Sequence, residues 1–369
     1  MKKIEIVTFS RAHNYGAMLQ AYALEETLIK RKYDTTLLNY RDKFIEKEYR
    51  IFKINRTNII TIIKSIVKDI IFFNKNVKRY MACKKFEDNN LLFGNIEYKD
   101  AESLKNYKNA DILIAGSDQI WNMKITNGLS DVYTLNFGDK NIKKISYAAS
   151  IGDIDLMKEN TNCYKLKIKN IDNISVREED AKIELDKIME KKINVVVDPT
   201  LLLNVNDWNH AIKNIQVINQ NYIVAYVIQP DEEYVKIVNY LSEKTGLKIV
   251  HFGVKNPGYK NILKCAYTEG PLEFINYIKN AKYVVATSFH ATIFSILFNK
   301  KFFIIPHKKT GSRVTNLLKK LNISGRTFES FDEFKNIDYD FETDWEKVNK
   351  KLQEEREESI SWLKNAIEG

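Results

Sequence analysis

Short runs of apolar and β-branched residues alternate with amphipathic stretches along most of the chain. Ten such runs predict buried strands, at residues 4–9, 34–40, 111–117, 144–150, 173–177, 194–200, 222–228, 248–253, 283–288 and 301–306. Between them, apolar residues recur with helical spacing, for example over 18–30, 233–244 and 271–280. Nearly continuous apolar strands separated by helices are typical of parallel sheets covered on both faces. The pattern therefore predicts an α/β protein.

The predicted strands form two sets, one that ends near Leu203 and one that begins near Tyr222. We expect two Rossmann-like domains, an N-terminal one over 1–203 and a C-terminal one over 204–340. The remaining 341–369 reads as a long charged helix, and we expect it to cross back and pack on the N-terminal domain.

An insertion over about 43–90 interrupts the first domain. Ile59, Ile63, Ile66 and Ile70 recur there with helical spacing, opposite a polar face, so 57–74 is predicted to form an amphipathic helix. Residues 41–90 hold 13 Lys and Arg against 6 Asp and Glu, which concentrates there most of the chain's net charge of +10. Such a helix either packs on its own domain or makes peripheral contact with an anionic membrane surface.

Composition excludes several other classes of protein. The three cysteines lie far apart and show no metal-ligand spacing, so neither a disulfide framework nor a metal site is expected, and a cytoplasmic location fits best. No apolar stretch is long enough to span a membrane or to serve as a secretory signal. The glycine motifs that bind dinucleotides and nucleotide phosphates are absent, and no cofactor is expected. The basic residues follow no nucleic-acid-binding motif.

Polar residues follow directly after six of the predicted strands. Because parallel sheets bind ligands beyond the carboxyl ends of their strands, these residues are candidates for a site, and their basic character suits an anionic ligand. They are Arg11, His13, Asn14 and Gly16; Gly116, Ser117, Asp118 and Gln119; Arg177 and Glu178; Asp198; Thr287, Ser288 and His290; and His307, Lys308 and Lys309.

The stretch ATSFHATIFSILF, residues 286–298, is the most informative of these segments. Ser288 suits an N-cap, which places His290 and Thr292 in the first turn of a helix. The free backbone N–H groups of such a turn bind anions, and a histidine that can be protonated there could act as a general acid. The following segment HKKTGSR adds Lys308, Lys309 and Arg313 as candidate ligands for phosphate or carboxylate.

Six segments together carry a resemblance to a known family. In chain order they read NYGAMLQAYAL, AGSDQIWN, KISYAAS, ISVREE, VVDPTLLL and SFHATIFSILFNK. The same segments stand in the same order in the polysaccharide pyruvyl transferase family, which this chain resembles from residue 4 to about residue 318. The resemblance implies a fold similar to the GT-B glycosyltransferases, with two Rossmann-like domains facing across a cleft.

The resemblance also implies an activity, the transfer of the pyruvyl group of phosphoenolpyruvate to a sugar of a cell-surface polysaccharide precursor. The acceptor would be a sugar nucleotide or a lipid-linked saccharide. His290 corresponds to the family's proton donor. The implied donor-binding residues are Arg177, Ser288, Thr292, Lys308, Lys309 and Arg313. The residues expected to contact the acceptor are His13, Asn14, Gly16, Gln20, Ser117, Asp118 and Gln119.

This sequence departs from the family pattern beside His290. Where the family commonly reads T-D-S-F-H-G-T, this chain has Thr287 in place of the aspartate and Ala291 in place of the glycine. The missing carboxylate removes an orienting partner for the histidine or for an acceptor hydroxyl. Two alternatives therefore remain open: a glycosyltransferase that uses a nucleotide sugar on the same fold, and an inactive carbohydrate-binding relative.

Overall fold

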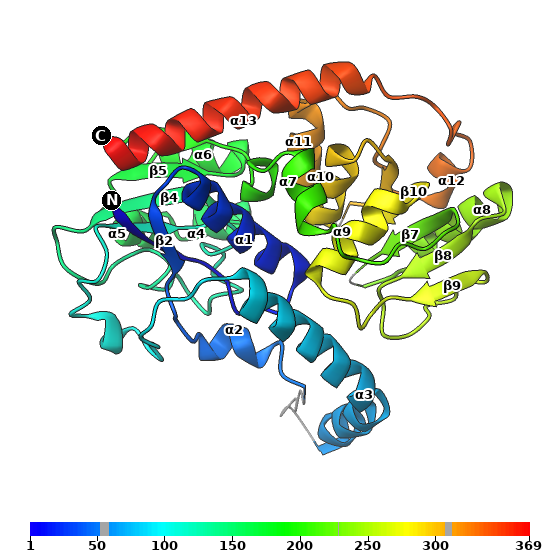
Figure 1. Cartoon of the computed structure of the whole chain (residues 1–369), viewed down its shortest axis with the longest axis horizontal. Coiled ribbons are helices and arrows are strands. Elements are labelled where there is room, and N and C mark those ends of the chain that lie inside the picture. The colour runs from blue at the N-terminus through cyan, green and yellow to red at the C-terminus, as the bar shows by residue number, and fades with distance from the viewer. Residues whose placement is uncertain (52–58, 228, 307–311) are drawn as a thin grey trace. The chain divides into compact units, whose positions relative to one another are not determined.

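A computed structural model describes residues 1–51, 59–227, 229–306 and 312–369 (Figure 1). The chain divides into two compact units. Unit 1 comprises Met1–Arg50, Lys84–Leu203 and Gln353–Gly369, and unit 2 comprises Ile51–Cys83 and Asn204–Leu352. Each unit is built around one parallel sheet flanked by helices, which confirms the predicted α/β class.

The sheet of unit 1 has the order β2-β1-β3-β4-β5-β6, and every neighbouring pair is parallel. Its strands are β1 (Lys3–Val7), β2 (Asp34–Leu37), β3 (Ile112–Ala115), β4 (Lys143–Ala149), β5 (Asn173–Val176) and β6 (Ile193–Val195). Its helices are α1 (Tyr15–Lys30), α2 (Lys43–Lys47), η1 (Glu102–Leu104), α4 (Ile154–Glu159), α5 (Thr161–Ile168), α6 (Glu179–Asp186) and η2 (Pro199–Leu201).

The sheet of unit 2 has the order β11-β10-β7-β8-β9 and is also parallel. Its strands are β7 (Tyr222–Tyr226), β8 (Lys248–His251), β9 (Ile262–Cys265), β10 (Tyr283–Ala286) and β11 (Lys301–Ile304). Its helices are α7 (Val205–Ala211), α8 (Glu232–Thr245), α9 (Pro271–Asn280), α10 (Phe289–Leu297), α11 (Ser312–Lys320) and α12 (Phe331–Phe334). Two long helices, α3 (Ile59–Asn90) and α13 (Trp345–Glu368), contribute residues to both units.

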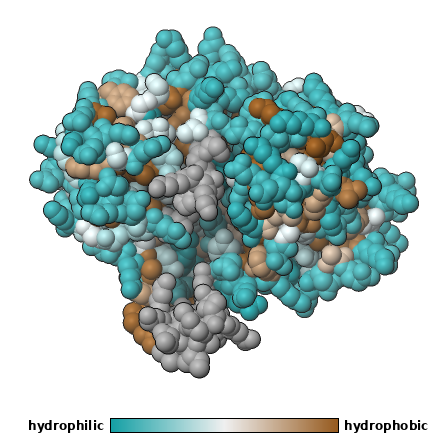
Figure 2. Space-filling view, turned by 180° about the vertical axis from the view of Figure 1, so that it is seen from behind, coloured by the Kyte–Doolittle hydropathy of each residue, from teal (hydrophilic) through white to brown (hydrophobic). Residues whose placement is uncertain are grey.

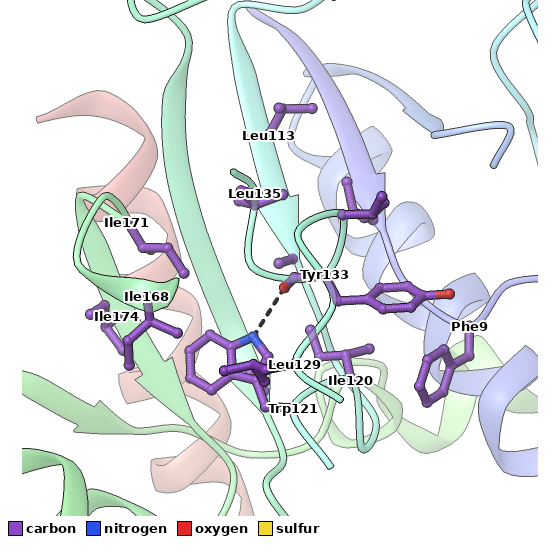
Figure 3. Packing of buried hydrophobic residues seen from close by; sticks show 14 of the residues in the cluster. Phe9, Leu113, Ile120, Trp121, Leu129, Tyr133, Leu135, Ile168, Ile171 and Ile174 are labelled. Carbon is purple, nitrogen blue, oxygen red and sulfur yellow. Dashed lines mark hydrogen bonds between the residues drawn. The ribbon is translucent and has the colours of Figure 1, made fainter. Parts of the chain in front are cut away.

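The core of unit 1 is built around Trp121 and Tyr133, which follow β3 (Figure 3). The Trp121 indole is fully buried and donates a hydrogen bond to the Tyr133 carbonyl oxygen at 3.0 Å, so its polar N–H group is satisfied within the core. The Tyr133 ring meets Phe9 edge-to-face with ring centroids 5.0 Å apart. These contacts fix the segments that follow β1 and β3, where candidate site residues lie.

The last helix, α13, contacts unit 1 through buried polar groups. Arg356 donates to the carbonyl oxygen of Leu201 at 2.6 Å, and the Ser359 hydroxyl accepts from the backbone N–H of Val197 at 3.0 Å. Nearby, the Trp362 ring lies 6.2 Å from the Tyr147 ring. These residues anchor the C-terminal half of α13 to the segment around η2.

The contact-based units differ in two places from the domains expected from sequence. Most of the insertion, Ile51–Cys83, belongs to unit 2 and not to the N-terminal unit. The boundary near the C-terminus falls at Leu352 rather than at 340, inside α13. Both differences arise because α3 and α13 are single helices with contacts on both units, and hydrophobic periodicity alone does not show which unit a helix contacts.

The buried carboxylate of Glu25 on α1 makes the stability of unit 1 depend on pH. Glu25 is 2% exposed, and its oxygens accept from the backbone N–H of Leu92 at 3.1 and 3.2 Å. Burial raises its pKa to about 8, against the lowering effect of that hydrogen bond. A folded-state pKa above the unfolded one adds stability that is complete below about pH 4.5 and is lost as the pH rises through about 8.

We therefore expect E25Q, which stays neutral, to match the wild type near pH 5 and to be more stable at pH 8.5. The difference should exceed about 1 kcal/mol, because one pKa unit corresponds to about 1.4 kcal/mol. Thermal unfolding across this pH range measures it. E26Q is the matched control, because the neighbouring Glu26 carboxylate, unlike that of Glu25, is partly exposed. A constant difference between E25Q and wild type would contradict the assignment.

Candidate active-site residues in the two units

In unit 2, the N-terminus of α10 gathers several predicted donor-site residues. Ser288 is the N-cap, and its hydroxyl accepts from the backbone N–H of Ala291 at 3.5 Å. His290 lies in the first turn and is 8% exposed, and its ring meets that of Phe289 edge-to-face at 5.4 Å. The arrangement is the predicted one: a histidine at a helix N-terminus, where backbone N–H groups favour anions.

Arg313 lies beside the same helix. Its guanidinium is 5.8 Å from the centre of the Phe289 ring, so a cation and His290 both adjoin one phenylalanine. Thr292, also in the first turn of α10, is fully buried. Its hydroxyl donates to the carbonyl oxygen of Ser288 at 3.0 Å. Thr292 therefore supports the helix start. Lys308 and Lys309 lie outside the described residues.

In unit 1, the loop after β1 carries a buried ion-pair network. Arg11 donates to Glu87 at 2.6 Å and to the side chain of Asn39 at 2.6 Å, while His13 Nε2 lies 3.8 Å from Glu87. Burial by itself would raise the pKa of Glu87, but hydrogen bonds from His13 and Lys84 and the charge of Arg11 outweigh it and lower that pKa to about 2. His13 is thus held against a carboxylate at the C-terminal end of α3.

Asn14 and Gly16 form the start of α1. The Asn14 side chain is the N-cap and accepts from the backbone N–H groups of Gly16 at 3.0 Å and Ala17 at 3.4 Å. Asn14 is partly exposed, and Gly16 is buried. The residue types of this turn are therefore explained by helix capping, and Asn14 retains a surface that a ligand could reach.

Two residues predicted to contact the acceptor are buried and bonded to each other. Gln20 and Ser117 are both 0% exposed, and the Gln20 carbonyl oxygen accepts from the Ser117 backbone N–H at 2.9 Å. The Gln20 amide donates to Thr8 at 2.8 Å, and the Ser117 hydroxyl donates to the carbonyl oxygen of Ala148 at 2.8 Å. These side chains join α1 to the end of β3, and the geometry assigns them to support rather than to direct contact.

Gly116 explains why the turn after β3 contains a glycine. Its φ is +127°, and a Cβ atom there would lie 2.0 Å from the carbonyl oxygen of Tyr147. Asp118 and Gln119 follow and are partly exposed. The Asp118 side chain accepts from the Gln119 backbone N–H at 2.8 Å, and Gln119 accepts from the Asn122 side chain at 2.9 Å. This turn presents carboxylate and amide groups that a sugar hydroxyl could reach.

Arg177, directly after β5, lies between two carboxylates. Its Nη1 donates to Asp198 at 2.8 Å and its Nε donates to Glu178 at 3.3 Å, with the Arg177 side chain 2% exposed. Ser150 also donates to Glu178, and Thr200 donates to Asp198. Burial would lower the pKa of Arg177, but the two carboxylates and Asp118 outweigh it and raise that pKa.

The sequence pattern made Glu178 and Asp198 candidates without a donor or acceptor role, and it did not point to Glu87. Glu178 and Asp198 were recognised as polar residues after strands, and that position was the available signal for them. Glu87 lies far along the insertion, so nothing local pointed to its contact with His13. Among the described residues, no group of three or more His, Cys, Asp and Glu side chains could hold a metal ion.

Comparison with models of protein families identifies the family of this chain. A family model described as polysaccharide pyruvyl transferase matches residues 14–309. The chain belongs to the polysaccharide pyruvyl transferase family. This match covers most of the chain and the candidate residues from Asn14 to Lys309, with His13 and Arg313 just outside it, and it confirms the resemblance seen in the sequence motifs. The pyruvyl transferase family is a family of transferases, so the chain is an enzyme of that class.

The pyruvyl transferase chain is also similar to solved structures of UDP-GlcNAc 2-epimerases and of a glycosyltransferase. A UDP-GlcNAc 2-epimerase from Neisseria meningitidis bound to UDP-GlcNAc shows 12% identity and a TM-score of 0.48, over 99% of this chain and 94% of that one. One from Methanocaldococcus jannaschii shows 14% identity and a TM-score of 0.48, over 96% and 92%. The glycosyltransferase SnogD from Streptomyces nogalater shows 8% identity and a TM-score of 0.42, over 99% of both chains. No curated protein sequence matches significantly.

Proposed function

We propose that this pyruvyl transferase moves the pyruvyl group of phosphoenolpyruvate onto a sugar of a cell-surface polysaccharide precursor, with His290 as the general acid. The observation that carries the proposal is the family match across residues 14–309, which includes a buried histidine in the first turn of α10. The two chemical demands of the donor are an acid and cations for its anionic groups, and His290 and Arg313 both adjoin Phe289.

The donor binds at the α10 N-terminus in this proposal. The backbone N–H groups of the first turn and the Arg313 guanidinium would hold its phosphate or carboxylate. Lys308 and Lys309 are proposed as further donor ligands. Arg177 is proposed as a donor ligand as well, and its guanidinium pairs with Asp198 and Glu178.

The bonds and protons of the proposed reaction balance. His290 protonates the methylene carbon of phosphoenolpyruvate, which leaves an oxocarbenium-like centre at the carbon that bears the phosphate. One sugar hydroxyl adds to this centre and releases its proton, which restores His290. A second hydroxyl then displaces phosphate, which departs with the second proton. The products are a cyclic pyruvate ketal and inorganic phosphate. General acid catalysis and anion binding therefore account for the residue types.

The acceptor is proposed to contact unit 1 through the partly exposed Asn14, Asp118 and Gln119. Carboxylate and amide groups exchange hydrogen bonds readily with sugar hydroxyls. Gln20 and Ser117 act behind this surface by holding α1 against the turn after β3. The acceptor itself is a sugar nucleotide or a lipid-linked saccharide.

Thermal unfolding with candidate donors tests the proposal. Ligand binding to the native state raises stability by RT ln(1 + [L]/Kd), about 2.7 kcal/mol at a concentration 100 times Kd. We expect millimolar phosphoenolpyruvate to raise the unfolding temperature, and phosphate to be released once an acceptor mixture is added. A shift with a UDP- or GDP-sugar, without phosphate release from phosphoenolpyruvate, would instead support a glycosyltransferase. Binding of saccharides with no turnover of either donor would support the inactive relative.

A further inference from the structure

One face of α3 is held against unit 2 by residues at helical spacing. Phe72, Asn76, Arg79 and Cys83 follow one another at intervals of four, three and four residues, so they share a face. Asn76 accepts from the Tyr267 hydroxyl at 2.9 Å, and Arg79 donates to the Tyr267 carbonyl oxygen at 3.1 Å. Cys83 is fully buried. This face explains how residues 72–83 of the helix are fixed to unit 2.

The opposite face carries apolar side chains that the protein leaves in solvent. Val67, Ile71, Lys78, Met81 and Lys85 follow at a second helical spacing, and Ile70 lies next to them. Val67 is 49% exposed, Ile70 64%, Ile71 67% and Met81 62%. We call these six residues the outer face of α3. Figure 2 shows apolar residues in brown at the lower end of the view, where the same helix lies in Figure 1.

The charge around the outer face indicates what covers it. Between residues 67 and 85 the sequence has six Lys and Arg and one Asp. Lys78 and Lys85 stand on the outer face itself and are exposed. A symmetric contact between two copies would set this positive charge against itself, because a two-fold interface brings the same patch together. A negatively charged surface is the complementary partner.

Apolar side chains interleaved with lysines fit the surface of a lipid bilayer. The apolar groups enter the region between headgroups and acyl chains, and each basic residue near anionic lipid contributes about 1 kcal/mol. No helix in the described part of the chain is both long and apolar enough to cross a bilayer. We propose that the outer face of α3 binds peripherally to an anionic membrane surface.

The proposed membrane contact is inferred from the outer face of α3 alone and does not depend on the proposed pyruvyl transfer. It adds a consequence if the acceptor is lipid-linked, because the enzyme and its substrate would then share one surface. The same face would raise the local concentration of enzyme at the substrate.

Vesicle co-sedimentation of the full chain tests the inference. We expect binding to vesicles of phosphatidylcholine and phosphatidylglycerol at 50 mM NaCl, with much weaker binding at 500 mM NaCl or to phosphatidylcholine alone, because salt screens the attraction. Ile70→Ser/Ile71→Ser/Met81→Ser should abolish it. Lys78→Gln/Lys85→Gln should reduce the partition coefficient at least tenfold, since two basic residues at about 1 kcal/mol each correspond to roughly a thirtyfold change.

The matched control is Leu166→Ser/Ile183→Ser, which removes two apolar side chains that are 62% and 48% exposed in unit 1. This variant should bind as the wild type does, and all variants should keep the wild-type unfolding temperature because their substituted side chains are exposed. Absence of binding at low salt would overturn the inference, as would equal loss in the control. A dimer that dissociates in the triple variant, without vesicle binding, would assign the face to a second copy.

Discussion

Replacing His290 with Asn is expected to lower the turnover of phosphoenolpyruvate by about 10²–10⁴-fold, the usual contribution of a positioned general acid. Asparagine is polar and fits the buried position, but it cannot protonate the methylene carbon. The measurement is phosphate release in an acceptor mixture on which the wild type turns over. His290 is buried in the first turn of α10, so the unfolding temperature should be recorded for the same variant.

His210→Asn is the control for His290→Asn, because His210 is an exposed histidine in the last turn of α7 in the same unit. It should keep wild-type turnover. The phosphoenolpyruvate-induced rise in unfolding temperature separates binding from chemistry. A variant that loses turnover and keeps this rise has lost the acid alone. If His290→Asn turned over at the wild-type rate, the general-acid assignment would be wrong.

The sequence predicted the buried strands well because their signal is local. All ten predicted runs overlap a strand of the structure, since apolar β-branched residues suit buried parallel strands. The strand missed was β9, Ile262–Cys265. It lies at the edge of its sheet, its side chains are partly or largely exposed, and it contains Lys264. An edge strand of this kind has no continuous apolar run by which to recognise it.

Helix α3 shows a second limit of the pattern. Isoleucine spacing predicted a helix over 57–74, whereas the structure continues it to Asn90. Residues 57 and 58 lie outside the described residues. The continuation is held by polar contacts, such as those of Asn76 and Arg79 with Tyr267, which lies nearly 200 positions away. Hydrophobic periodicity carries no information about such contacts.

The candidate site residues show the same contrast between local features, which the sequence predicts, and long-range contacts, which it does not. The N-cap of Ser288 and the first-turn position of His290 follow from adjacent residues, and both predictions are confirmed by the geometry of α10. Ser117 follows its strand as predicted, but the complete burial of Gln20 and Ser117 depends on a contact between residues 97 positions apart. Sequence position therefore indicates which residues lie near the edge of the sheet, and only three-dimensional packing separates exposed groups from supporting ones.

Arg177 is expected to be the most costly charged residue to remove from unit 1. R177M should destabilise the protein by about 3–5 kcal/mol, because it leaves the buried carboxylates of Asp198 and Glu178 without their cation. The shift in the unfolding midpoint measures this cost. K182M is the matched control, because Lys182 pairs with Asp186 on α6 where both side chains are substantially exposed. Exposed pairs contribute only about 0–1 kcal/mol.

A double substitution distinguishes lost pairing from lost packing. R177M/D198N removes one of the orphaned charges, so it should be less destabilised than the sum of the two single variants. Additive effects would mean that the arginine acts through its apolar stem alone. The same variants also test the donor role expected for Arg177. If this guanidinium serves only to join the turns after β5 and β6, the double variant keeps the stabilisation by phosphoenolpyruvate, and if it binds the donor, that stabilisation is lost.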